Sequence, residues 1–171
     1  MGLITALAIS ISVLGGIATF LFFGPLAGIG IQIWIAFIAW ATFYHCGGKE
    51  AGLTKTLTNN IFGAIVAWVA LLLVTQIPLA NALGLPLWAG ICVLITVFVL
   101  VYAAHNAMVS DIPAGVFGYA ATAGLALSGN KLGAVLAPSL ENPLVIAVIS
   151  LIVGAVLGYI SEKIAGALAK S

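Results

Sequence analysis

The sequence predicts an all-helical protein that crosses a membrane about six times, as a single transmembrane domain over residues 1–171. Of its 171 residues, 64% are hydrophobic and only 5% are charged. Soluble domains carry roughly 25% charged residues, so a chain with so few charges is expected to have lipid around it. Long apolar runs recur along the sequence without strand-like alternation, which excludes an outer-membrane barrel.

Six segments are predicted as membrane spans because about 20 apolar residues cross a hydrocarbon layer of about 30 Å. Backbone polar groups in lipid must be satisfied within the segment, which makes each span a helix. The predicted spans are residues 3–22, 29–45, 57–76, 87–107, 113–128 and 143–165. The first lacks a preceding basic region and is too long for a signal peptide, so we interpret it as a span.

The lysines predict how the spans are oriented. With six spans, Lys49, Lys55, Lys163 and Lys170 share one side of the membrane, and only Lys131 lies on the other. Cytoplasmic loops carry the excess of basic residues. Both termini are therefore expected in the cytoplasm.

A weak internal repeat relates the two halves of the chain. Gly24–Gly28, before the second span, is similar to Asp111–Gly115, before the fifth, and Gly63 and Gly154 each open a Gly-Ala stretch in the third and sixth spans. Three spans per half predict an inverted repeat, a common plan in transporters and channels. Chance similarity in a biased composition is the alternative.

Several residues are candidates for a solute path. The second span carries an aromatic stripe, and its short, glycine-rich counterpart, the fifth span, is expected to supply the opposing wall with Phe117 and Tyr119. Two asparagines open the third span, where capping of the helix is the other expected role. Packing or an interfacial belt is the alternative for the aromatic residues. The candidates are Trp34, Phe37, Trp40, Tyr44, Asn59, Asn60, Phe117, Tyr119 and Thr122.

Four polar residues are candidates for gating at one mouth. They are His45, His105, Asn106 and Asp111, and Tyr102 lies on the same helix face as His105. Histidine titrates near neutrality, so this group would respond to pH. The alternative is that these residues meet headgroup water at the interface. Their spacing matches no recognised metal-ligand pattern, and we expect no metal and no cofactor.

Other features narrow the class of function. A net charge of +1 and the absence of arginine argue against nucleic acid as a partner. No catalytic motif is visible, so we expect no enzyme. Cys46 and Cys92 are interpreted as small buried hydrophobic residues. Gly154 and Gly158 predict a tight helix contact, within the chain or between subunits.

Three stretches resemble the YcdZ-like family of small bacterial inner-membrane proteins, a family of unknown function. They are Ser110–Thr122, Gly154–Ser161, and Trp40–Thr42 followed by Gly47 and Gly48. The resemblance implies a bacterial inner membrane and brings no activity or site residues. In architecture alone, the chain is similar to small six-span urea and amide channels.

Three hypotheses of function follow. The first is a channel or facilitator for a small, uncharged polar solute, since the acidic residues fall in loops or at span ends. The second is a secondary transporter coupled to protons through His105, His45 or Asp111. The third is a non-transporting scaffold or partner subunit. Because six short spans enclose little volume, we expect a symmetric homo-oligomer surrounded by membrane lipid.

Overall fold

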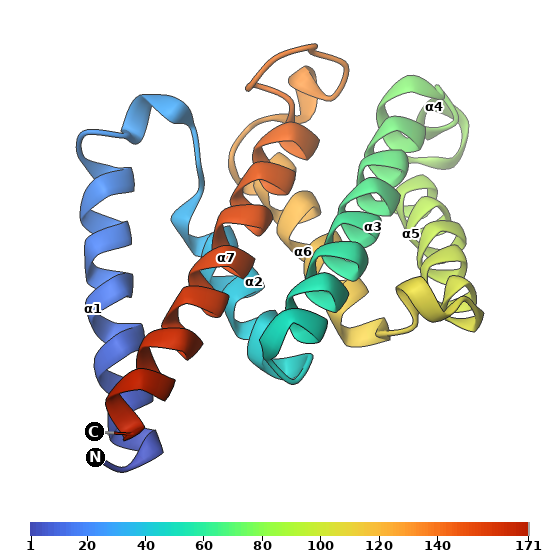
Figure 1. Ribbon diagram of the computed structural model, residues 1–171. Helices are drawn as coiled ribbons and strands as arrows, with labels where there is room; N and C mark the ends of the chain where they lie inside the picture. Colours follow the sequence, from blue (N-terminus) through green and yellow to red (C-terminus); the bar gives the residue numbers. More distant parts are fainter. Residues whose placement is uncertain (171) are drawn as a thin grey trace. The chain divides into compact units, whose positions relative to one another are not determined.

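The computed structural model describes residues 1–170 and contains no strand in this range, which confirms an all-helical protein. Seven α-helices are joined by turns and short 3₁₀ segments (Figure 1). The α-helices are α1 (Leu3–Phe23), α2 (Ile33–His45), α3 (Lys49–Gln76), α4 (Ala80–Leu83), α5 (Leu85–Tyr102), α6 (Ile112–Ser128) and α7 (Pro143–Lys170).

Four helices are long and apolar enough to cross a membrane, namely α1, α3, α5 and α7. Two more, α2 and α6, are apolar but have only 13 and 17 residues. At 1.5 Å per residue they are about 20 and 25 Å long, shorter than a hydrocarbon core of about 30 Å. Where the sequence predicts the second and fifth spans, the structure therefore has short apolar helices.

The largest difference from the predicted boundaries is at the start of α3, which begins at Lys49 rather than Leu57. The loop predicted for residues 46–56 is wrong from Lys49 onward. Gly47, Gly48 and Lys49 reverse the chain with φ angles of 92°, 68° and 57°, which the two glycines adopt without steric cost. Glu50 then lies in the first turn of α3, where the helix dipole favours a negative side chain.

Contacts divide the chain into two compact units. The first unit comprises Met1–Leu57 and the chain from Ile149 onward, and the second comprises Thr58–Val148. Each unit contains one complete short helix and most of a 28-residue helix. The first unit has α2 with α7 and the second has α6 with α3, so the long helix of each half belongs mainly to the unit of the other half.

In the first unit, α2 lies directly against α7 at two glycines. A β-carbon on Gly154 would overlap the backbone of Ala36, and one on Gly158 would lie 2.9 Å from the side chain of Phe43. Small residues allow this approach, and in lipid such close packing drives helix association in place of the hydrophobic effect. The tight contact predicted from Gly154 and Gly158 is confirmed, and it is internal to the chain.

The second unit packs α6 against α3 in the same way. A β-carbon on Gly63 of α3 would overlap the carbonyl group of Gly115, and one on Gly118 would overlap the backbone of Asn60. Backbone meets backbone at this crossing too. The two units therefore seat their short helices by the same kind of contact.

Each short helix is also tied at its start to the interior of its long helix. The Oγ atom of Ser150 accepts the backbone N–H of Gln32, the N-cap residue of α2, at 2.9 Å. The Oδ1 atom of Asn59 accepts the backbone N–H of Asp111, the N-cap residue of α6, at 2.9 Å. In both units this side chain lies one helical turn before the contact glycine, so both units share one local plan.

We predict that Gly154→Ala lowers the thermal stability of the detergent-purified protein, because the added methyl group must displace the backbone of α2. Overpacking of this kind costs about 1–3 kcal/mol. Gly166→Ala on the same helix is the control, since its added carbon meets nothing within 4 Å and alanine favours the helix. Equal unfolding temperatures for the two variants would show that α2 does not rest on Gly154.

Candidate functional site

The aromatic stripe predicted on the second span forms a row of edge-on ring contacts along α2. Trp34, Phe37 and Trp40 follow one another with ring centroids 5.7 and 6.0 Å apart. Trp34 is 59% exposed and also contacts Phe23 of α1, whereas Trp40 is only 4% exposed. The stripe therefore leads from the exposed start of α2 into the interior of the first unit.

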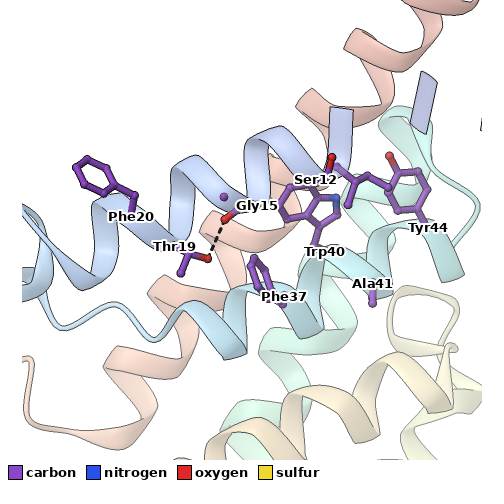
Figure 2. Close-up of a pocket in the computed structure, with 10 residues that line it drawn as sticks. Ser12, Gly15, Thr19, Phe20, Phe37, Trp40, Ala41 and Tyr44 are labelled. Atoms are coloured by element: carbon purple, nitrogen blue, oxygen red, sulfur yellow. Dashed lines mark hydrogen bonds between the residues drawn. The ribbon is translucent and has the colours of Figure 1, made fainter. Parts of the chain in front are cut away.

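A groove of about 860 Å³ lies between this stripe and α1 (Figure 2). Its lining residues are Ile11, Ser12, Gly15, Gly16, Thr19 and Phe20 of α1 and Phe37, Trp40, Ala41 and Tyr44 of α2. The wall that faces the stripe thus consists largely of small residues of α1. Phe117 and Tyr119, which the sequence predicts as the opposing wall, belong to the second unit.

The polar atoms along the groove are already hydrogen-bonded within the protein. Trp40 Nε1 donates to Ser161 Oγ at 3.0 Å. Tyr44 Oη lies 2.7 Å from the same oxygen and must donate to it, because Ser161 uses its own proton on the carbonyl of Gly158. On α1, the hydroxyl of Thr19 is bonded to a carbonyl of its own helix at 2.8 Å. The groove therefore offers packing surface rather than free hydrogen-bond donors.

We predict that Ser161→Ala destabilises the protein, because the buried indole N–H of Trp40 and the Tyr44 hydroxyl lose their shared acceptor. Leaving a buried donor unpaired costs about 1–3 kcal/mol. Ser12→Ala is the control, since that exposed hydroxyl bonds only to the carbonyl of Ile9 in its own helix. A thermal unfolding scan compares the two, and equal stability would mean that the stripe keeps its position without Ser161.

Asn59 and Asn60 lie in the interior of α3, because this helix begins at Lys49. The expectation that they cap the start of their own helix is therefore wrong. Asn59 instead fixes the start of α6 through the backbone of Asp111. Asp111 in turn caps α6, since its carboxylate accepts the backbone N–H of Ala114 at 3.1 Å.

Asn60 differs from its neighbour in having no hydrogen-bond partner. Asn60 is only 1% exposed, and neither the nitrogen nor the oxygen of its side-chain amide is hydrogen-bonded to the protein. In residues 1–170 the only other such buried side-chain group is the hydroxyl of Thr56, one turn earlier on α3. An unpaired buried group costs about 1–3 kcal/mol, and more in lipid.

The first unit has an apolar residue at the position that corresponds to Asn60 in the shared plan. There, the residue that follows the tethering Ser150 is Leu151, which is fully buried and apolar. In the second unit, Asn60 follows the tethering Asn59 in the same way. The shared plan is thus compatible with an apolar side chain, and the amide of Asn60 needs another explanation.

The other candidates of the fifth predicted span lie on α6 in the second unit. The hydroxyl of Tyr119 is 3.0 Å from that of Thr96 on α5, and Thr122 Oγ1 donates to the carbonyl of Gly118 at 3.0 Å. Phe117 is 38% exposed. Both hydroxyls are engaged, whereas Asn60 is a buried solute-path candidate with unused hydrogen-bonding capacity.

The gating candidates have local structural contacts. His105 packs edge-on against Tyr102, with ring centroids 5.0 Å apart, which confirms their shared face. Asn106 caps the 3₁₀ turn that follows it, and Asp111 caps α6. His45 is the exposed last residue of α2 in the first unit. Within residues 1–170, three or more His, Cys, Asp and Glu side chains nowhere converge as metal ligands would.

Charged residues of α3 and α7 form an ion cluster in the first unit. Glu50 accepts hydrogen bonds from Lys163 at 2.9 Å and from the Tyr159 hydroxyl at 2.7 Å. The carboxylate of Glu162 accepts the backbone N–H of Lys49 at 2.7 Å. Glu162 and Lys163 are adjacent in sequence, but adjacent helix residues point apart, and each bonds to the start of α3.

Long apolar helices with short ones packed between them define the chain as a helical membrane protein. It belongs to the family described as "Protein of unknown function (DUF1097)", whose profile matches residues 8–166. This match confirms that the chain comes from a family of unknown function. Comparison with curated proteins finds no match, and comparison with solved structures finds none either.

Proposed function

We propose that this protein lets a small, uncharged polar solute cross the membrane, as a channel or facilitator. The observation that carries the proposal is the buried, unpartnered carboxamide of Asn60 on an apolar helix. A carboxamide offers both donors and an acceptor without charge, so it suits a neutral solute with both kinds of group. Polar groups held inside membrane helices against their energetic cost commonly mark substrate pathways.

We further propose that the chain is an inverted repeat of two three-helix halves, with α2 and α6 as its two short membrane segments. The shared plan supports this. In both units, the side chain that bonds to the N-cap residue of the short helix lies one helical turn before the contact glycine on the long helix. Short helices at corresponding places in two halves point to a central solute site in many transporters.

We also propose an orientation, a membrane and an oligomeric state for the protein. The lysine distribution supports a membrane orientation with both termini in the cytoplasm. The YcdZ-like resemblance supports a bacterial inner membrane. A homo-oligomer would bury part of the exposed apolar surface of α1 and α5, and the remainder would contact lipid.

We expect Asn60→Leu to reduce the permeability of proteoliposomes to urea, acetamide or glycerol by about tenfold. This factor corresponds to about 1.4 kcal/mol, the scale of one hydrogen bond. Thermal stability should stay the same or rise, because an apolar group replaces an amide that has no partner. Asn81→Leu, at an exposed position of α4, is the matched control and should keep its flux.

The same assay separates the competing functions. Unchanged flux in Asn60→Leu would contradict the role given to Asn60. Flux that requires a pH gradient would replace the facilitator with a proton-coupled transporter, for which His45, His105 and Asp111 are the candidates. If the unaltered protein carries none of these solutes, a scaffold or partner subunit becomes the better explanation.

A further inference from the structure

In the first unit, a chain of contacts places the ion cluster near the level of the middle of α1. The groove runs from Phe20 and Phe37 at one end to Ser12, the neighbour of Ile11, and Tyr44 at the other (Figure 2). The hydroxyl of Tyr44 lies 2.7 Å from Ser161. The next residue after Ser161 is Glu162, which binds the backbone of Lys49. The ion cluster therefore lies within about one helical turn of the level of Ile11.

Two helices continue past this level with apolar sequence. Toward its N-terminus, α1 extends about 12 Å further, and its residues Leu3, Ile4 and Ile9 are 59%, 83% and 42% exposed. Beyond Lys163, α7 continues through the uncharged stretch 164–169, which belongs to an apolar helix. In Figure 1 the first residues of α1 and the last turn of α7 lie at the same end of the first unit.

The level of the membrane surface follows from these lengths. If the surface lay at the ion cluster, both apolar helix ends would stand in water. If all of α1 lies in the membrane, its 21 residues span about 31 Å, which matches the hydrocarbon thickness. The ion cluster then lies about 10 Å below the surface.

The charged side chains cannot face lipid at that depth. Glu50 and Lys163 are 70% and 56% exposed, and charged groups in contact with acyl chains are costly. Water must therefore reach them. Since α1 and α7 stay apolar over the same depth, this water has to enter on the side where α3 begins.

We infer that the first unit contains a water-filled recess, which runs from the membrane surface at the N-terminal end of α1 to the ion cluster and Tyr44. At Tyr44 the recess meets the aromatic groove between α1 and α2. It would carry a solute partway into the membrane before any dry passage begins. The inference goes beyond the proposed function, because it concerns access of water and holds whether or not a solute crosses.

The test compares thiols at similar depth on two faces of the full-length protein in proteoliposomes. In a Cys46→Ser background that keeps the buried Cys92, Ala51→Cys reports on the recess. Ala8→Cys and Ile9→Cys report on the outer face of α1, and all three positions are exposed. A membrane-impermeant cationic methanethiosulfonate should modify residue 51 at least about tenfold faster, because thiolates form in water and not in lipid.

Two results would overturn the recess. Equally fast modification at all three positions would place the first turns of α1 in water. Slow modification at all three, with fast modification after denaturation, would show that water does not reach the ion cluster. Because the measurement is thiol modification and not flux, failure here leaves the proposed function standing, and failure of the flux test leaves the recess standing.

Discussion

Backbone contact between a short helix and a glycine of a long helix is the interaction on which the rest of this structure depends. Lipid chains are as apolar as leucine, so burying apolar surface does little to bring membrane helices together. Close packing at Gly154 and Gly63 provides the attraction instead. The hydrogen bonds from Ser150 and Asn59 then fix where each short helix begins.

Because close packing at glycines holds the helices together, a buried polar side chain that bonds to nothing in the protein indicates another role. Most buried ones have a structural purpose: Ser161 holds two aromatic side chains, and Asn59 holds the start of α6. Asn60 is next to Asn59 in sequence but has no partner, and the other unit has Leu151 in the matching place. The charged side chains of the ion cluster need contact with water, because they lie at the same level as apolar parts of α1. Each feature is explained if water or another polar molecule reaches it within its own unit.

Composition and span length predicted the fold class because they depend only on the cost of charged and polar groups in lipid. Gly154 and Gly158 predicted a close helix contact for a similarly local reason. The start of α3 was missed because residues 49–56 are polar and resemble a loop, although the adjacent Gly47 and Gly48 marked the turn. The glycine wall of the groove was missed too, although small residues four apart, Ser12 with Gly16, were a signal for it.

The roles of Asn59 and Asn60 could not be separated from sequence. Adjacent residues on a helix point about 100° apart, so only the position of α6 decides which amide finds a partner. A cryo-EM map of the protein in lipid nanodiscs, at a resolution that shows water, tests this point most directly. We expect density for water or a small solute about 3 Å from the Asn60 carboxamide. An Asn60 amide bonded to another protein group would contradict the proposed role.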